Sequence, residues 1–503
     1  MASFRNHDFP PLPSHCVWNT ASNNVVAKPK APVSVRPSVT INDLPEELLV
    51  AIFQYLPVTD LGGFRLVSLV ALSSTTKRFR RLVVEELYAT YDSVFSEPYL
   101  FLRTLISNPN RAESVKHASL TCSKWAPSDR QRYVPHAQDK KLIKEGMKLL
   151  GLPIWKTWAT ECNCGGVDVN TLYAAILMHT PNIASLSING CGRDSEDLVW
   201  LALFRHAYSG ASLGSVHRLP FLQSVRIDMQ NLTLTKLGPV FRTPSLRRIC
   251  LENVLCDAFG SDDEYIYTDN VRQSLHQAIP ERCNDIEDIS LEHSFLNTNS
   301  LDIILSSTRW LKTLKYILFT DENNDFDSPT LTTLLQMHKS SLETLTVKYS
   351  GYCTPRPQSS INLRNGMRDF PALTHIDCAL SMLVSPFSAT LSDKLPPSLL
   401  TLHIKLGKYA SEDNLTVLEN FASDCSTSTP VLSEIKINIS ELSKKFRYDW
   451  ARLIALFAST GLALVVDKQR DESDDGETGL DVSRWESDSS QASDEVGLYS
   501  DEG

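Results

Sequence analysis

One spacing pattern recurs along most of the chain and constrains its fold more than any other feature. Nine stretches place apolar residues at positions one, four and six, and their starts lie 24 to 40 residues apart. The fourth and sixth positions share one face of a β-strand, because side chains alternate along a strand. Strands repeated at this distance predict a right-handed solenoid with one parallel sheet. The nine stretches are Ile183/Leu186/Ile188, Leu222/Val225/Ile227, Leu246/Ile249/Leu251, Ile286/Ile289/Leu291, Leu311/Leu314/Tyr316, Leu342/Leu345/Val347, Leu373/Ile376/Cys378, Leu399/Leu402/Ile404 and Leu432/Ile435/Ile437.

Helical segments lie between and around these strands. Residues 102–120 predict a helix and a first strand, and residues 450–467 predict a helix that ends near Gly461 and a last strand that can cap the array. The alternation resembles degenerate leucine-rich repeats, although the asparagine that regular repeats place after the strand is mostly absent. The resemblance implies an irregular α/β solenoid. We assign its apolar positions to packing and any function to exposed positions and loops.

A segment with clear helix start and stop signals precedes the array. Pro45 suits the first position of a helix, and Glu46 and Glu47 place negative charge at its positive dipole end. Pro57 then disfavours a helical conformation at the residue before it. Apolar residues spaced for one face of this helix predict a wide apolar stripe. The stripe consists of Leu44, Leu48, Leu49, Ile52, Phe53 and Leu56.

Two further short helices follow in the sequence. Thr59 or Asp60 can cap the second, and the third is predicted over residues 77–88. Gly62 and Gly63 in the second helix each cost up to about 1 kcal/mol relative to alanine. A three-helix unit this small buries little by itself and is more stable with a partner.

The order of helix start, apolar stripe, proline stop and second helix resembles the F-box motif, over about a tenth of the chain. The resemblance implies that this unit docks on a small Skp-type adaptor, which connects it to a cullin and a RING subunit. With the repeats, it resembles an F-box protein with degenerate leucine-rich repeats of the fungal type. The motif residues are Leu44-Pro45, Glu47-Leu48-Leu49, Ile52-Phe53, Tyr55-Leu56-Pro57, Asp60-Leu61 and Arg65-Leu66-Val67-Ser68.

The resemblance also implies which residues contact the adaptor or support that contact. An alternative is that these apolar residues only pack the helical unit onto the rest of the chain. The residues are Leu44, Pro45, Leu48, Ile52, Phe53, Leu56, Pro57, Leu61, Leu66 and Val67.

Residues 69–76 depart from the motif, because they separate Ser68 from the basic and aromatic segment 77–80 that such motifs place almost directly after it. Three interpretations are open: a longer loop, a second helix extended by this stretch, or a faulty gene model that retains non-coding sequence. The first two displace the third helix and weaken the correspondence for Phe79 and Leu82.

We find no sequence motif for catalysis, phosphate binding, a cofactor or a metal ion. Cys162 and Cys164 have one residue between them and no second pair at zinc-site spacing. We interpret these cysteines, with Trp155 and Trp158, as a packed junction between the helical unit and the array; the alternative is a ligand pocket. Histidines occur in or beside predicted strands and are interpreted as surface or hydrogen-bonded polar residues rather than bases. They include His117, His293, His375 and His403.

Charge is concentrated at the end of the chain. Residues 467–503 contain thirteen acids and three bases, which accounts for the whole net charge of -10. The remaining residues are neutral overall, which argues against general nucleic-acid or anionic-membrane binding. Scattered cysteines in odd number, eleven in all, and the lack of an apolar leader predict a reducing compartment, the cytoplasm or nucleus.

Composition predicts four regions. They are a disordered proline-rich leader (1–39), the F-box (40–91), the repeat-like solenoid (92–466) and a disordered acidic tail (467–503), which either keeps the array soluble or serves regulation.

The leading hypothesis is the non-catalytic substrate-recognition subunit of an SCF-type cullin–RING ubiquitin ligase. Such a receptor holds its substrate beside the conjugating enzyme and needs no catalytic side chain of its own. The alternatives are an interaction scaffold without ubiquitin output and, third, an enzyme whose site has no familiar motif. The identity of the protein substrate is beyond what the sequence predicts.

Overall fold

The computed structural model describes part of the chain. The predicted leader lies outside the described residues, as does the predicted tail from residue 470 onward. The described ranges are 40–56, 63–122, 133–164, 169–190, 199–209, 213–229, 232–254, 269–294, 296–319, 331–350, 362–363, 366–384, 390–406, 412–440 and 450–469.

Contacts divide the chain into two units, Met1–Ile52 and Phe53–Gly503. The first unit contains a short 3-10 helix, η1 (Ile41–Asp43), and most of helix α1 (Glu46–Gln54). The Asp43 side chain closes back on Thr40 at the start of η1, since both the backbone N–H and the hydroxyl of Thr40 donate to Asp43 Oδ2, at 2.8 and 2.9 Å. Helix α1 starts at Glu46, one residue after the predicted first position Pro45, and ends at Gln54, two residues before Leu56.

Within the described ranges, the second unit is built on a parallel sheet of twelve strands, which follow one another in chain order. All nine predicted strands are present in it. The predicted first and last strands are β2 and β12, and β1 was not predicted. The strands are β1 (Thr90–Asp92), β2 (His117–Thr121), β3 (Ser185–Asn189), β4 (Ser224–Asp228), β5 (Arg248–Glu252), β6 (Asp288–Ser294), β7 (Thr313–Phe319), β8 (Thr344–Ser350), β9 (His375–Ala379), β10 (Thr401–Leu406), β11 (Glu434–Ser440) and β12 (Ala463–Gln469).

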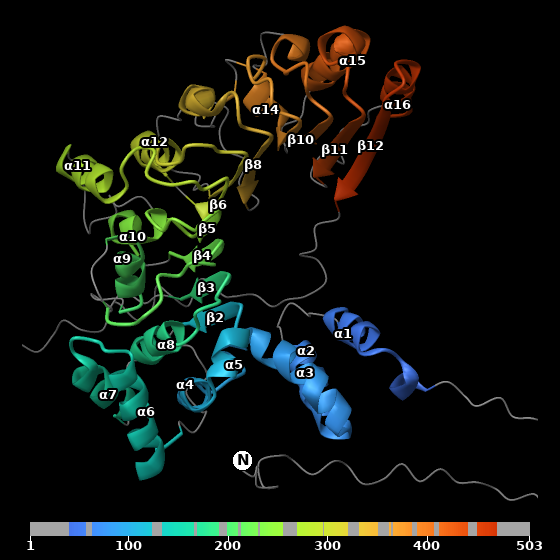
Figure 1. Cartoon of the computed structure of the whole chain (residues 1–503). Coiled ribbons are helices and arrows are strands. Elements are labelled where there is room, and N and C mark those ends of the chain that lie inside the picture. The colour runs from blue at the N-terminus through green and yellow to red at the C-terminus, as the bar shows by residue number, and fades with distance from the viewer. Residues whose placement is uncertain are drawn as a thin grey trace, which may run out of the picture. The chain divides into compact units, whose positions relative to one another are not determined.

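Helices connect the strands of this unit. Figure 1 shows α9 to α12 along one side of the strands. The α-helices are α2 (Gly63–Thr75), α3 (Lys77–Ala89), α4 (Pro98–Ser107), α5 (Pro109–Ser114), α6 (Ala137–Leu149), α7 (Trp155–Asn163), α8 (Val169–Met178), α9 (Leu201–Ser209), α10 (Gly238–Phe241), α11 (Asp269–Ala278), α12 (Thr298–Ser306), α13 (Leu331–Leu334), α14 (Leu380–Leu383), α15 (Glu412–Ser428) and α16 (Trp450–Ser459). The 3-10 helices are η2 (Leu234–Leu237), η3 (Leu335–His338) and η4 (Leu391–Asp393).

Strand register explains why the spacing pattern holds. Leu314 of β7 pairs with Leu345 of β8, which lies in register with Ile376 of β9. Every residue at the fourth position of the nine stretches is aligned and buried in the same way, so each repeat covers the apolar face of its neighbour. The mixed α/β architecture of a helical unit followed by a leucine-rich-repeat-like solenoid is therefore confirmed. The aligned residues are Leu186, Val225, Ile249, Ile289, Leu314, Leu345, Ile376, Leu402 and Ile435.

The end of the array extends further than composition predicts. Gly461 has a φ of +81° just after α16, as expected for the residue that ends a helix. Strand β12 then continues to Gln469, whereas we predicted that the folded body ends at Val466. Asp467 lies in register with Asn438 and forms an ion pair with Lys436, with Nζ and Oδ2 3.1 Å apart. Three residues of the predicted acidic tail therefore belong to the sheet.

Residues 69–75 continue the second helix. Helix α2 runs without interruption to Thr75, and Leu69 within it is buried. Thr76 then caps α3, because its hydroxyl oxygen accepts the Phe79 N–H at 3.0 Å. The structure thus agrees with the extended-helix interpretation of this stretch over the loop. The third helix begins at Lys77, as predicted.

Part of the tryptophan and cysteine patch is packed. Trp158 and Cys162 of α7 belong to the core cluster of the second unit, and Trp155 packs against it. Burial raises the pKa of the Cys162 thiol to about 12, which makes it a poor nucleophile. Packing is therefore confirmed for Trp158 and Cys162, whereas Cys164 is exposed, and the role of the patch as a junction stays a prediction. None of the helices in the described ranges combines the length and apolar character needed to cross a membrane.

Candidate functional site

Helix α1 presents apolar side chains to solvent. Leu48 is 52% exposed and Ile52 is 43% exposed, whereas Leu49 is fully buried. Leu48 and Ile52 are four residues apart and therefore lie on the same face of the helix. Neighbouring exposed aliphatic side chains mark an interaction site more often than isolated ones.

Phe53, next to this face, has a supporting position. Its side chain is 2% exposed, and its ring meets the Phe79 ring edge to face, with centroids 6.0 Å apart. Such a pair is worth about 1 kcal/mol beyond the area it buries. Phe53 therefore anchors the end of α1 to α3 rather than offering a contact surface of its own.

Helix α2, which packs on α3, carries a further exposed apolar side chain, Val67. The two helices are joined by an ion pair between Arg65 and Glu86 and by a hydrogen bond from Arg80 Nε to the Ser73 carbonyl at 3.2 Å. These contacts fix the orientation of α2, and Val67 points away from the packed side, where it is 67% exposed.

The ten predicted adaptor-binding residues fall into four groups. Pro45, Leu48, Ile52 and Val67 are exposed; Leu44, Leu56 and Leu66 are partly exposed; Phe53 is buried; Pro57 and Leu61 lie outside the described residues. Their binding role stays a prediction. Sequence reasoning did not include Ile41 and Tyr55, which are also exposed, because helical spacing alone does not reveal exposure.

The face of the sheet opposite the buried positions is lined with paired charges. Glu292 accepts hydrogen bonds from Lys315 Nζ at 2.6 Å and Ser290 Oγ at 3.0 Å, and lies 3.5 Å from Arg226 Nη2. Burial alone would raise the pKa of Glu292, but these partners outweigh it and the pKa is lowered. Asp377 similarly faces Lys348, with Nζ and Oδ2 2.6 Å apart. The ladder register sets these partners side by side and keeps this face polar.

One group on this face has metal-ligand atoms. Cys250 Sγ and carboxylate oxygens of Glu252 and Glu292 lie within 4.8 Å of one another. Arg226 pairs with both glutamates, and burial raises the pKa of the Cys250 thiol. The ion pairs account for the grouping without a metal ion.

The four strand-associated histidines lie on four strands, β2, β6, β9 and β10, of which β9 and β10 are neighbours. His293 and His375 are exposed, and His375 Nδ1 meets the Thr374 hydroxyl at 2.7 Å. His403 lies 3.9 Å from Asp377 Oδ2 through Nδ1. Burial lowers the pKa of His117. Their surroundings fit the interpretation as surface or hydrogen-bonded polar residues.

Buried histidines elsewhere make the fold sensitive to acid. Burial, and to a lesser degree His217, lowers the pKa of His179 to about 4, and burial also lowers the pKa of His217. In the unfolded chain these histidines bind a proton near pH 6.5, whereas in the folded chain they bind it only at lower pH. Folding stability therefore decreases as the pH drops below about 6.5. We expect the titration of His179 to lower the free energy of unfolding by about 2 kcal/mol between pH 7 and pH 5.

Thermal unfolding followed over this pH range tests the expectation. The melting temperature should fall with pH, and more shallowly in His179→Gln, which has no titrating ring. If the melting temperatures of the natural chain and of His179→Gln fell equally with pH, the expectation would be wrong.

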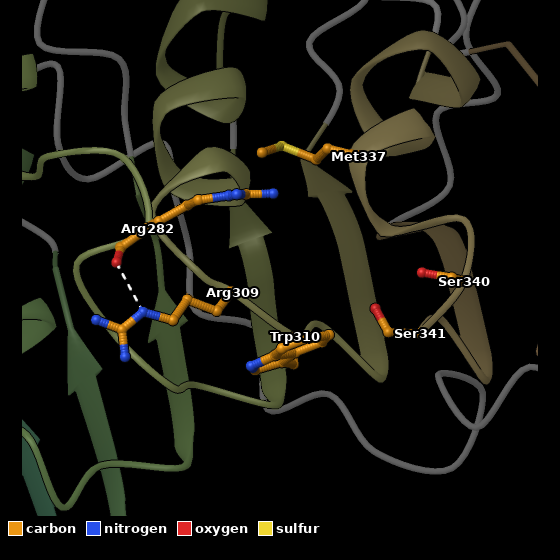
Figure 2. A pocket seen from close by; sticks show the side chains of 6 residues that line it. All are labelled: Arg282, Arg309, Trp310, Met337, Ser340 and Ser341. Atoms are coloured by element: carbon orange, nitrogen blue, oxygen red, sulfur yellow. Dashed lines mark hydrogen bonds between the residues drawn. The ribbon is translucent and has the colours of Figure 1, made fainter.

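A hollow of about 290 Å³ lies at the edge of the sheet where β6, β7 and β8 begin. Figure 2 shows its six lining side chains, which come from three successive turns between helix and strand. Trp310 is 61% exposed and Met337 is 40% exposed. Both charged residues in the lining are arginines. The lining consists of Arg282, Arg309, Trp310, Met337, Ser340 and Ser341.

Comparisons with known proteins address the helical unit most directly. The F-box-like family model matches residues 41–92. No protein of curated function matches the sequence significantly. Among solved structures, the crystal structure of a TLR13–ssRNA13 complex is similar over 60% of this chain, with 14% sequence identity and a TM-score of 0.30. The match covers 42% of that structure's chain, so this chain spans less than half its length.

The matched residues contain η1, α1, α2, α3 and β1, the elements that present Leu48, Ile52 and Val67. F-box domains bind Skp-type adaptors in general and are non-catalytic parts of the ligases that contain them. Residues 41–92 are therefore an F-box-like domain, which this chain joins to a leucine-rich-repeat-like parallel sheet.

Proposed function

We propose that the chain is the substrate-recognition subunit of an SCF-type cullin–RING ubiquitin ligase. The observation that carries this proposal is the F-box-like match over residues 41–92. The exposure of Leu48, Ile52 and Val67 supports it, since a docking domain needs apolar side chains that its own fold leaves uncovered. In this proposal the domain binds a Skp-type adaptor and, through it, the cullin and RING subunits.

The repeats would hold the protein substrate. A solenoid suits this role because its stacked repeats form one extended, semi-rigid surface. The receptor contributes proximity: it holds the substrate beside the conjugating enzyme, and effective concentration replaces a catalytic group. The chain would then work in the cytoplasm, the nucleus or both.

Co-purification of the full-length chain tests the proposal. We expect the adaptor, the cullin and the RING subunit to be recovered with it, and we expect proteins bound to the repeats to receive ubiquitin when the conjugating enzymes are added. Absence of the adaptor would refute the proposal. Recovery of the adaptor without ubiquitin transfer to any bound protein would instead favour the interaction scaffold.

A further inference from the structure

We propose that the hollow at Arg282 and Trp310 binds a partner segment in which an acidic group lies next to an apolar side chain. The acidic group is a carboxylate or a phosphoryl group. This inference rests on the proposed function, because it names the chemical class of the segment that the receptor recognises.

The residue types in the lining are those that concentrate binding energy at protein interfaces. Tryptophan, arginine and methionine are enriched in interface cores, and tryptophan and arginine are prominent among hot-spot residues. Here Trp310 and Met337 are exposed on neighbouring turns, and Figure 2 shows the Arg282 side chain extending toward Met337. A volume of about 290 Å³ accommodates one or two side chains rather than a large cofactor.

Charge selects the occupant. Arg309 is already committed, since its Nη1 lies 2.9 Å from Asp285 Oδ1. Among the residues that the structure describes, no carboxylate pairs with the guanidinium of Arg282. An acidic group brought into the hollow would therefore meet a guanidinium that no described carboxylate pairs with, and the exposed Ser340, elsewhere in the lining, offers a further hydrogen-bond donor. Trp310 and Met337 would cover the neighbouring apolar side chain.

The backbone that presents Arg282 is held firmly. Arg282 has a φ of +52°, an uncommon conformation for a residue with a side chain, and persists there because neighbours fix it. Its N–H donates to the Ser306 carbonyl at 2.9 Å, and its carbonyl accepts the Arg309 Nε–H at 3.1 Å. Ser341, on the opposite side of the hollow, donates its hydroxyl to the Leu311 carbonyl at 2.8 Å.

A buried polar residue, Asn284, ties the first two turns together. Its Nδ2 donates to Ser307 Oγ at 3.1 Å and its Oδ1 accepts the Ile286 N–H at 3.1 Å. The backbone of these two turns is thus held in place before any partner arrives, which lowers the entropy lost on binding.

Peptide binding to the purified full-length chain tests the proposal. Four synthetic libraries of short peptides are used in parallel. Each has one fixed residue with randomised residues on both sides, and the fixed residue is glutamate, phosphoserine, glutamine or lysine. We expect the immobilised chain to select peptides from the glutamate or phosphoserine library with an apolar residue beside the fixed position. The stronger of these two libraries identifies the source of the acidic group. Selection from the glutamine or lysine library to the same degree would overturn the proposal, as would failure of both acidic libraries.

Variants tie the selected peptides to the hollow. Arg282→Glu and Trp310→Ala should each lower the affinity of the chain for a selected peptide by about tenfold or more. Two exposed residues outside the lining provide matched controls: Arg272→Glu on α11, and Phe221→Ala, which precedes Leu222 as Trp310 precedes Leu311. Controls should change affinity by less than about twofold. Unchanged binding to correctly folded Arg282→Glu would refute the site.

Adaptor recovery measured in the same preparations separates this inference from the proposed function. If the chain retains the adaptor but selects no acidic peptide, only the proposed peptide site in the hollow is refuted. A chain that never recovers the adaptor refutes the receptor role, whatever the peptides do.

Discussion

Replacing both Leu48 and Ile52 by aspartate is expected to weaken adaptor binding by about 100-fold or more, equivalent to about 2.7 kcal/mol. These side chains are exposed in the free chain, so charge there costs little in the folded state. In a complex, the carboxylates would be buried against an apolar partner without a cation, which is strongly unfavourable. Titration of the purified chain with the adaptor measures the change.

Leu149→Asp is the matched control, since Leu149 is an exposed leucine near the end of a different helix, α6. It should bind the adaptor as the natural chain does. All chains should keep the same circular dichroism and melting temperature. If the double variant binds normally, the adaptor does not use this face of α1.

Variants of Phe53 and Leu49 distinguish residues that stabilise the helical unit from residues that contact the adaptor. Both are buried, and truncating either to alanine should lower folding stability of the helical unit by about 2–4 kcal/mol. Adaptor binding should fall only as far as the folded fraction falls. Urea titration of each variant, followed by adaptor titration at low urea, distinguishes these effects.

Leu345→Asn is expected to destabilise the array by about 4 kcal/mol or more, whereas Thr346→Asn should change stability by less than about 1 kcal/mol. Leu345 is fully buried, and the replacement removes its packing and leaves an amide without partners. Thr346, the next residue of β8, lies on the polar face and is only partly buried. The same new side chain thus tests the two faces of one strand.

Urea unfolding and limited proteolysis of the two purified variants measure the difference. In a repeat array each unit is stabilised by its neighbours, so the loss in Leu345→Asn should open cleavage sites around β7, β8 and β9 first. Similar stability of the two variants would mean that the face assignment is wrong.

The array was predictable because its signal is local and repeated. The spacing in a stretch such as Leu342/Leu345/Val347 follows from the two-residue period of a strand. Because neighbouring repeats pair in register, equivalent positions are buried and apolar in each of them. Strand β1 had no such signal, because it is three residues long and only Tyr91 is buried. The extension of β12 to Gln469 was also missed, since Asp467 and Lys468 are polar and paired through register rather than by apolar burial.

The candidate site was predictable only in part. The motif indicated Leu48, Ile52 and Phe53 together, because a stripe at helical spacing does not distinguish an exposed aliphatic residue from one that packs. The hollow had no sequence signal at all. Arg282, Trp310 and Met337 lie far apart in the chain and belong to three different repeats.

The sequence by itself determined the order of elements, the strand positions of the array and the F-box-like pattern, because each depends on residues close together along the chain. The tertiary structure decided which apolar residues of that pattern remain exposed, how charges pair across the polar face of the sheet, and which side chains meet at Arg282. Those properties depend on contacts between distant segments, which are set by the stacking of repeats rather than by local spacing.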